Sequence, residues 1–528
     1  MRNAPQENLD TILAGIVPIG LPAGRDAPLD VGETTLDAPA ADGSRVGGGE
    51  TSPSGAGLMA RGALWLAASS LVVKAAQTLV LLILAALLAP SALGLIAIGT
   101  LVLNASSLIA GAGTSTALVY WRGDALRPAR TALTIALIAG GAMTAVAWMT
   151  APWLARALHA EDGGADVIRG LTSVVPFYAA AYVTLELLRR DLAFVRRIIP
   201  DVLAATAGAA VAVVLAVAGH GVISLVIGQI VQGVLTLLLA WVVGARVRPG
   251  WNREDAHGLL GYGGHLAGGN ILQLVLLNVD YVIVARVLGA TPLGQYSLAF
   301  RLAYLPYLNV AFVISGAAFP YLCRLTGPAI GRASERIATI ALLVLVPLCL
   351  GIALFADQLT LLGHKWAPAV PAMRWLALYT LLLSLGQLAH TPLNAVGRTR
   401  LTLQLRLLHL VALVVALIFL APRGITAVAV GQVLAVTATV GITIALTRRH
   451  VPGVSLRRFA AALAPCAAGT VAMAAVVLGV QLAFPSADAS VTGFLLLALL
   501  GFAAYSALLW SLDRANLVRT FQLIRTRT

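Results

Sequence analysis

Residues 401–447 read LTLQLRLLHLVALVVALIFLAPRGITAVAVGQVLAVTATVGITIALT. The stretch holds two apolar segments, 401–421 and 424–447, and each is long enough to cross the hydrocarbon core of a bilayer, which takes roughly 20 residues. Between them stands Pro422-Arg423-Gly424, and proline and glycine are the usual terminators of helices. The pattern therefore predicts a transmembrane helical hairpin.

The same alternation of long apolar segments and short polar gaps runs from Arg61 almost to the end of the chain. The chain is 59% hydrophobic and only 11% charged, which excludes a water-soluble protein. The fold class predicted is an all-α polytopic membrane protein with about fourteen transmembrane helices, at residues 63–88, 93–119, 130–154, 168–188, 198–219, 221–245, 258–285, 293–319, 334–355, 371–394, 401–421, 424–447, 457–483 and 490–512.

Positive charges set the predicted orientation of these spans, because loops rich in Lys and Arg stay in the cytoplasm. With the N-terminus inside, 27 Lys and Arg residues fall at cytoplasmic positions and 6 at the opposite positions. We therefore expect both termini in the cytoplasm. The net charge of +14 is spread between the spans rather than clustered on one helix, so it does not indicate nucleic-acid binding.

Residues 1–60 are rich in Gly, Ala, Pro, Asp and Ser without periodicity, which predicts a disordered cytoplasmic tail. The apolar run 11–21 follows acidic residues and contains Pro18, which is not typical of a signal peptide. Met59 stands directly before the first span and is an alternative start of translation.

An internal repeat is visible at an offset of 200 residues. Ile83, Ala85, Leu88, Leu93 and Gly94 match the residues at 283, 285, 288, 293 and 294. An offset of six spans is what two related six-helix bundles produce, and transporters are often built from such halves. We predict an N-terminal bundle at 61–247, a C-terminal bundle at 248–450, and two extra helices with a basic cytoplasmic tail at 451–528.

The same hairpins carry a family resemblance. Residues 84–94, LAALLAPSALG, resemble the "LARLLTPxDFG" hairpin of Wzx-type polysaccharide flippases, and residues 278–299, NVDYVIVARVLGATPLGQYSLA, resemble the family's "NxDxxxxxxxLG...LGxYxxA" signature. Pro306 and Pro320 are similar to its paired prolines, and residues 363–369, GHKWAPA, to its "GxxWxPA" stretch. The first hairpin departs from the pattern at Ala86, where the family usually has Arg, and Gly111 stands where an acidic residue is common.

The resemblance covers roughly residues 60–450 and implies a place in the multidrug/oligosaccharidyl-lipid/polysaccharide exporter superfamily. It implies two pseudo-symmetric six-helix bundles, often with two extra helices, in the bacterial inner membrane. It also implies that a polyprenyl-pyrophosphate-linked oligosaccharide is flipped toward the periplasm, for exopolysaccharide, capsule or O-antigen synthesis. The expected partners are the lipid-linked oligosaccharide, membrane lipid, a polysaccharide polymerase and other biosynthesis proteins.

A charge inside the bilayer is costly, by about 2.5–3.5 kcal/mol, so it is a functional hypothesis by default. The candidates are Lys74 in the first span, Arg301 in the eighth, and Arg406 with His409 in the eleventh. Cations that line a cleft between the bundles would bind the pyrophosphate. The alternative for Arg301 and Arg406 is that they reach a helix end and snorkel.

Acidic residues could couple transport to H⁺ or Na⁺, and we expect no other cofactor and no structural metal site. Asp280 lies within the seventh span, six residues before Arg286. An ion pair with a nearby Arg is the alternative role of Asp280, and the sequence favours it slightly. Glu186 and Asp201 stand among several arginines and predict a cytoplasmic charge network or gate.

The glycine-dense run at residues 261–270 begins the seventh span. No strand precedes it, so it is not a nucleotide-binding loop, and its glycines favour close helix approach or bending. His265 and Asn270 within it could bind sugar hydroxyls or form an interhelical hydrogen bond.

No catalytic constellation is visible, so the chain is predicted not to be an enzyme. A membrane ligase or glycosyltransferase needs a sizeable extramembrane loop, and the outer gaps here are short. A cation-coupled drug or metabolite antiporter of the same architecture is the stronger alternative, but it predicts an aromatic and acidic cleft. The intramembrane Lys and Arg favour the flippase.

Overall fold

The computed structural model of the chain describes residues 78–525, except residues 112–113, 122, 161–162, 192 and 485–490. These described residues form helices and connecting turns without a β-strand, as the apolar pattern predicts. The helices are α3 (Pro90–Gly111), α4 (Thr114–Tyr120), α5 (Leu126–Ala157), α6 (Gly164–Thr172), α7 (Val175–Arg190), α8 (Phe194–Val217), α9 (Val222–Val243), α10 (Arg253–Leu288), α11 (Ala290–Pro306), η1 (Tyr307–Ala311), α12 (Phe312–Cys323), α13 (Pro328–Leu354), η2 (Ala356–Leu362), η3 (His364–Trp366), α14 (Ala369–Ala395), α15 (Thr399–Leu420), η4 (Ala421–Arg423), α16 (Ile425–His450), α17 (Leu456–Ala483) and α18 (Val491–Arg525).

Twelve helical segments of the described chain are long and apolar enough to cross a membrane, and each coincides with a predicted span. Two predicted spans remain. Most of the span 63–88 lies outside the described residues, and its described part is the short helix Thr78–Leu87. The span 258–285 lies in α10, which has 36 residues but is not among the twelve. The protein is thus a multi-pass helical membrane protein, and the count of fourteen stays a prediction.

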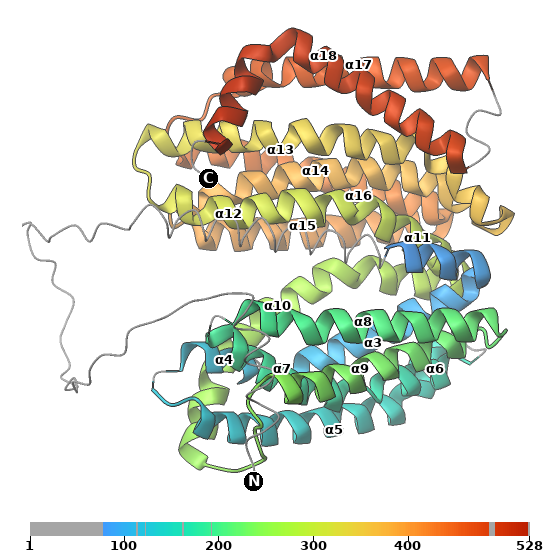
Figure 1. Cartoon of the computed structure of the whole chain (residues 1–528), viewed down its shortest axis with the longest axis vertical. Coiled ribbons are helices and arrows are strands. Elements are labelled where there is room, and N and C mark those ends of the chain that lie inside the picture. The colour runs from blue at the N-terminus through green and yellow to red at the C-terminus, as the bar shows by residue number, and fades with distance from the viewer. Residues whose placement is uncertain are drawn as a thin grey trace, which may run out of the picture. The chain divides into compact units, whose positions relative to one another are not determined.

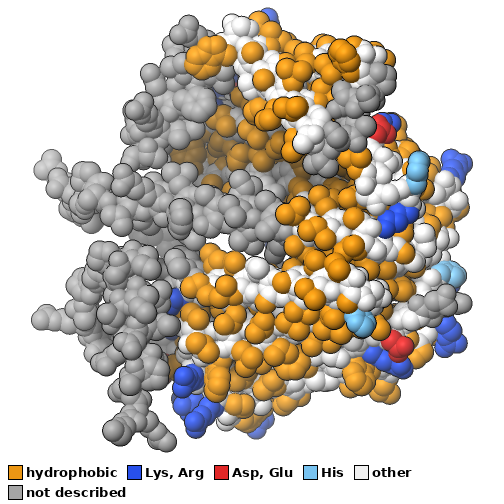
Figure 2. Space-filling model, turned by 45° about the vertical axis from the view of Figure 1, so that its right-hand side comes forward, with side chains coloured by type: hydrophobic (Ala, Val, Ile, Leu, Met, Phe, Trp, Pro, Cys, Tyr) orange, Lys and Arg blue, Asp and Glu red, His pale blue; other side chains and the backbone are white. Residues whose placement is uncertain are grey.

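Large apolar side chains cover much of the surface, as Figure 2 shows for one face. Met149 and Leu482 are both 83% exposed, and Phe419 is 72% exposed. A water-soluble protein rarely exposes apolar patches of this extent, whereas lipid solvates them without cost. The surface therefore agrees with a helical protein surrounded by acyl chains.

The helices fall into two groups by their contacts (Figure 1). The N-terminal group is α3–α9 together with helix Thr78–Leu87, whose Leu84 packs against Ala212 of α8. The C-terminal group is α11–α16, and the pair α17 and α18 packs on α13. α10 contacts α3, α4 and α5 as well as α11, α15 and α16, so it joins both groups. The boundaries predicted for the two bundles and the tail at 1–60 stay predictions, and the tail lies outside the described residues.

The crossing of α3 and α11 is the largest direct contact between the two groups, and glycine permits it. A Cβ on Gly94 would overlap the carbonyl oxygen of Ala290, and a Cβ on Gly294 would overlap that of Pro90. Residues 94 and 294 are 200 positions apart, and so are residues 90 and 290, so the two contacts are equivalent in the repeat. The repeated positions therefore meet their own counterparts, as a pseudo-two-fold axis through the crossing requires.

The two helices part after the crossing. α3 is followed by α4, which packs on α5, α7 and α10, whereas α11 is followed by η1 and α12, which pack on α13 and α14. The crossing lies near the helix connections at residues 89, 158–160, 289 and 355–368. We call this the arginine-poor end, and it is the end that the Lys and Arg distribution predicts to be outside.

The α17–α18 pair is attached to α13 at a proline. Pro347 has no N–H, so the carbonyl of Leu343 loses its helical partner, and the Tyr505 hydroxyl donates to that carbonyl at 2.7 Å. A backbone acceptor without a donor is costly in lipid. The Tyr505 hydroxyl thus supplies the missing hydrogen-bond donor to α13, and the same contact attaches α17 and α18 to that helix.

Candidate functional site

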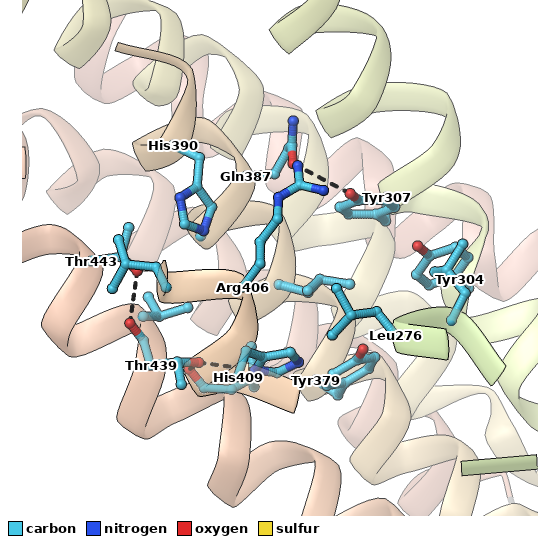
Figure 3. A pocket seen from close by; sticks show the side chains of 16 residues that line it. Leu276, Tyr304, Tyr307, Tyr379, Gln387, His390, Arg406, His409, Thr439 and Thr443 are labelled. Atoms are coloured by element: carbon cyan, nitrogen blue, oxygen red, sulfur yellow. Dashed lines mark hydrogen bonds between the residues drawn. The ribbon is translucent and has the colours of Figure 1, made fainter. Parts of the chain in front are cut away.

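A cavity of about 90 Å³ lies in the C-terminal group, between α10, α11, η1, α14, α15 and α16 (Figure 3). It has room for several water molecules or a single small polar group. Convergent polar side chains in an otherwise apolar region make it the default candidate binding site. Its aromatic and polar lining consists of Tyr304, Tyr307, Tyr379, Gln387, His390, Arg406, His409, Thr439 and Thr443.

The tyrosines of the cavity follow from the local structure of α11. Pro306 lacks an N–H, and the chain passes directly after it into the π-helix η1. Single π-helical turns are frequent at functional sites because they re-aim side chains. Tyr307 here stacks on Tyr304 with ring centroids 4.8 Å apart, and its hydroxyl donates to Gln387 Oε1 at 3.5 Å.

The cationic and imidazole side chains of the cavity come from α14 and α15. Arg406 and His409 are three positions apart on α15 and therefore share a face. His409 Nδ1 lies 3.0 Å from Thr439 Oγ1. His390 Nδ1 is buried and has no hydrogen-bond partner in the part of the chain that the structure describes. Figure 3 shows Arg406 extended between His390 and Gln387, an arrangement that suits a phosphate group or sugar hydroxyls.

A second polar cluster is buried between α10, α11 and α16. Asp280 is 2% exposed, and its Oδ2 accepts hydrogen bonds from the Tyr296 hydroxyl at 2.8 Å and from Gln432 Nε2 at 2.9 Å. Among the described residues, Asp280 Oδ1 and Gln432 Oε1 have no hydrogen-bond partner. Buried acceptors without donors are costly, and a proton or a small cation would satisfy them. We call these three residues the Asp280 cluster.

Aromatic rings connect the Asp280 cluster to the cavity. Tyr296, Phe300 and Tyr304 recur every four residues on α11, so they stand on one face of the helix. The ring centroids of Tyr296 and Phe300 are 5.9 Å apart, and those of Phe300 and Tyr304 are 5.1 Å apart. The cavity and the Asp280 cluster are therefore neighbouring parts of one region inside the C-terminal group.

The predicted substrate-binding residues have different outcomes. Arg406 lines the cavity. Arg301 is half-buried on α11 and does not line it. Lys74 lies outside the described residues. His265 and Asn270 lie in α10, at positions whose side chains are also outside the described part of the structure.

The hydrogen-bond partners of Asp280 differ from the arginine that the sequence slightly favours for it. Both partners of Asp280 are neutral, so no ion pair of Asp280 is present within the described residues. Arg286 is instead exposed and donates from Nη1 to the carbonyl of Ala157 at 2.8 Å. The two side chains, six residues apart on α10, thus have different neighbours, and the coupling or gating role of Asp280 and Arg286 stays a prediction.

The charge network around Glu186 is present at the arginine-rich end of the N-terminal group. Glu186 is buried and pairs with Arg189 at 3.3 Å and with Arg197 at 3.5 Å. Arg197 also lies 3.9 Å from Asp201. The network links the end of α7 to the start of α8, which suits either a structural tie or a gate.

Sequence reasoning missed most of the residues that line the cavity or complete the Asp280 cluster. One signal was available, because Tyr296, Phe300 and Tyr304 repeat at helical spacing in a chain with only 11 tyrosines. Another was the presence of glutamine and histidine inside apolar spans. Neither signal shows which of these side chains meet. The missed residues are Tyr296, Tyr304, Tyr307, Tyr379, Gln387, His390, Gln432, Thr439 and Thr443.

Comparisons with known proteins decide the family. Residues 83–371, more than half of the chain, match the family described as "Polysaccharide biosynthesis protein". The chain belongs to this family. This agrees with the resemblance to Wzx-type flippases that the two hairpins carry.

Curated relatives point the same way. The succinoglycan biosynthesis transport protein ExoT of Rhizobium meliloti is 25% identical over 273 residues, which are 51% of this chain and 55% of ExoT. The lipopolysaccharide biosynthesis protein WzxC of Escherichia coli is 24% identical over 180 residues, which are 33% of this chain and 37% of WzxC. The matched regions thus span about half or less of these relatives.

Solved structures share the fold. A lipid II flippase MurJ in an inward closed conformation matches with a TM-score of 0.68 and 12% identity, over 84% of this chain and 99% of that one. An inward-facing multidrug MATE transporter matches with a TM-score of 0.56 and 17% identity, over 73% of this chain and 95% of the transporter. At these identities the similarity establishes the architecture alone.

Proposed function

We propose that this protein is a flippase that carries polyprenyl-pyrophosphate-linked oligosaccharide units across the bacterial inner membrane, for exopolysaccharide, capsule or O-antigen synthesis. Membership in the polysaccharide biosynthesis protein family is the observation that carries the proposal. The names of the relatives support it, since they include transport proteins of succinoglycan and lipopolysaccharide synthesis. The fold supports transport, because it is shared with a flippase and with transporters.

The mechanism proposed is alternating access between the two helix groups. α3 and α11 are in contact at the arginine-poor end, while α4 and α12 pack into different groups. With the arginine-poor end outside, this arrangement corresponds to a path that opens toward the cytoplasm. Transport then requires that the α3–α11 contact separates and that the groups meet at the other end.

The cavity around Arg406 is the proposed contact for the polar part of the substrate. The guanidinium of Arg406 would bind two oxygens of a phosphate group as a bidentate donor. The hydroxyls of Tyr307 and Thr439 would bind sugar oxygens. Lys74, Arg301, His265 and Asn270 remain proposed contacts along the same path. Because the cavity holds only a small group, most of the oligosaccharide would lie outside it, between the helix groups.

The Asp280 cluster is the proposed coupling site. Its two unpartnered oxygens, Asp280 Oδ1 and Gln432 Oε1, would accept H⁺ or Na⁺. Occupation of the cluster would change how α10, α11 and α16 pack, and these helices also line the cavity. The networks at Glu186, Asp201 and Arg286 are proposed gates at the two ends of the N-terminal group.

The test is export of surface glycan in a strain that lacks the gene for this chain. Reintroduced wild-type protein should restore export and clear lipid-linked oligosaccharide from the inner leaflet. Arg406→Gln should lower export about tenfold at equal membrane abundance, and Arg406→Lys should retain part of it, because the charge remains while the bidentate fork is lost. Arg423→Gln is the matched control, since Arg423 is exposed at the turn after the same helix. Wild-type protein that leaves the lipid-linked oligosaccharide in the inner leaflet would contradict the proposal.

A cation-coupled drug or metabolite antiporter is the second candidate. The tyrosine-rich cavity beside a buried carboxylate favours it, because aromatic rings and acidic groups bind organic cations. Everted vesicles that carry the protein would then take up cationic dyes when a proton gradient is applied. Uptake that depends on the protein, without an effect on surface glycan, would select the antiporter.

A further inference from the structure

The loop at residues 363–368 of the C-terminal group sits on the end of the helix Thr78–Leu87 of the N-terminal group. Lys365 Nζ donates to the carbonyls of Ala86 and Leu88, both at 2.8 Å. Next to it, Trp366 Nε1 donates to the carbonyl of Ala85 at 3.0 Å. Three hydrogen bonds from two adjacent residues thus join segments that are almost 280 positions apart in the chain.

The contact has a clear physical basis. The last carbonyls of a helix have no partner within the helix and carry partial negative charge, so a lysine ammonium is a favourable cap. Helices are usually capped by their own following residues, but here Pro90 follows almost immediately and begins α3. The caps come from the other helix group instead. Trp366 is fully buried, and a buried indole contributes a large apolar area together with its one donor.

The loop itself is held firmly in the C-terminal group. Gln295 Nε2 on α11 donates to the carbonyl of Lys365 at 2.9 Å. Gly363 has φ +118°, a conformation that favours glycine, and its carbonyl accepts from the backbone N–H of Trp366 at 3.1 Å. Lys365 and Trp366 therefore move with α11 and α14, whereas Ala85 and Ala86 belong to the other group.

We infer that residues 363–368 form a latch that holds the two helix groups together at the arginine-poor end, and that Lys365 and Trp366 must leave the carbonyls of Ala85, Ala86 and Leu88 before the α3–α11 crossing can open. The inference rests on the proposed alternating access. It assigns a role in the transport cycle to residues that do not line the cavity around Arg406. The same sequence, GHKWAPA, is the stretch that resembles the family's "GxxWxPA" motif.

The experiment measures opening directly. Ser297 is buried and lies one turn beyond Gly294 at the crossing, so Ser297→Cys places a nearly isosteric thiol there. Cys323, Cys349 and Cys466 are replaced to remove the other thiols. Right-side-out vesicles are then treated with a membrane-impermeant thiol reagent, and the labelling rate reports how often the crossing opens to the outside.

Lys365→Met should raise this labelling rate about tenfold, because two charge-assisted hydrogen bonds are lost while the apolar stem remains. Trp366→Phe removes the Nε1–H donor and part of the ring but keeps an aromatic side chain, and it should raise the rate less. Lys365→Arg, which keeps the charge and the donors, should stay near the parent rate. Arg374→Gln is the matched control, since Arg374 pairs with Asp357 within the same group and at the same end.

Unchanged labelling in both Lys365→Met and Trp366→Phe, at normal membrane abundance, overturns the latch. An equal increase in Arg374→Gln also overturns it, because the effect would then reflect general loosening of this end. The readout does not depend on the substrate. If the parent protein fails to export glycan but Lys365→Met still accelerates labelling, the proposed substrate is wrong and the latch remains supported.

Discussion

The loop between α13 and α14 and the loop between α5 and α6 occupy corresponding places in the two helix groups, yet their contacts with the opposite group differ. The first brings Lys365 and buried Trp366 onto the end of helix Thr78–Leu87. Beside the second, exposed Arg286 of α10 donates to the carbonyl of Ala157, the last residue of α5. The repeat thus preserves the positions of backbone segments without preserving the side chains that hold them.

The same difference extends into the membrane. At the offset of 200 residues, Asp280 and Tyr296 correspond to Val80 and Ile96, which are apolar. The third member of the cluster, Gln432, corresponds to Gln232, so the N-terminal half repeats the glutamine but neither the carboxylate nor the tyrosine. Polar contacts inside the N-terminal half, such as that of Gln229 Nε2 with the Tyr178 hydroxyl, lie at other positions of the repeat.

At the crossing, equivalent positions of the two halves meet each other, and disrupting it should have the largest effect. Gly94→Val and Gly294→Val each insert a side chain where a backbone carbonyl of the other helix lies, so each should lower the free energy of unfolding by about 3 kcal/mol or more. Thermal unfolding in detergent measures this. Gly141→Ala is the control, because nothing lies within 4 Å of a Cβ there. A large loss for one glycine and none for its counterpart would contradict the pseudo-two-fold crossing.

Trp366→Ala should have the next largest effect on stability. It leaves a cavity in a fully buried position and removes the donor to Ala85, so a loss of about 3–5 kcal/mol is expected. Melting temperatures of the variant and of Trp366→Phe, which both lack the Nε1–H donor, show how much of the loss comes from the aromatic ring that phenylalanine retains. A loss below about 1 kcal/mol for Trp366→Ala would mean that the loop is not an important contact between the groups.

Asp280→Asn should change coupling more than stability. Asparagine keeps the shape of the side chain and can still accept from the Tyr296 hydroxyl, so the cost should be about 1 kcal/mol. It cannot gain a negative charge, so transport should lose its response to an imposed H⁺ or Na⁺ gradient. Glycan flipping in vesicles with and without a gradient tests this, and a full response in the variant would remove Asp280 from the coupling site.

Arg286→Ala should have the smallest effect. The side chain is exposed and its single bond is to a carbonyl that water can also solvate, so the expected loss is below about 0.5 kcal/mol. As a proposed gate at the same end, Arg286→Ala should raise the thiol-labelling rate of Ser297→Cys, but less than Lys365→Met does. Destabilisation as large as that of Trp366→Ala would show that the two loops contribute equally to the contact between the groups, which would contradict the difference between them.

The sequence by itself determined the helices and much of their pairing. Twelve predicted spans coincide with helices long and apolar enough to cross a membrane, because a lipid-facing helix must be apolar along its own length and this is a local property. The turn at residues 422–424 and the repeat around Gly94 and Gly294 were also readable, since glycine and proline act through their own backbone geometry.

Only the tertiary structure decided which polar side chains meet. Asp280 accepts a hydrogen bond from Gln432, 152 positions away in the chain, and Lys365 donates to the carbonyl of Ala86, 279 positions away. The cavity is lined by residues of α10, α11, η1, α14, α15 and α16. The sequence favoured an ion pair for Asp280 because charge is visible in a sequence, whereas a neutral donor on a distant helix is not. In lipid every buried polar group must find a partner, but the choice of partner depends on the packing of whole helices.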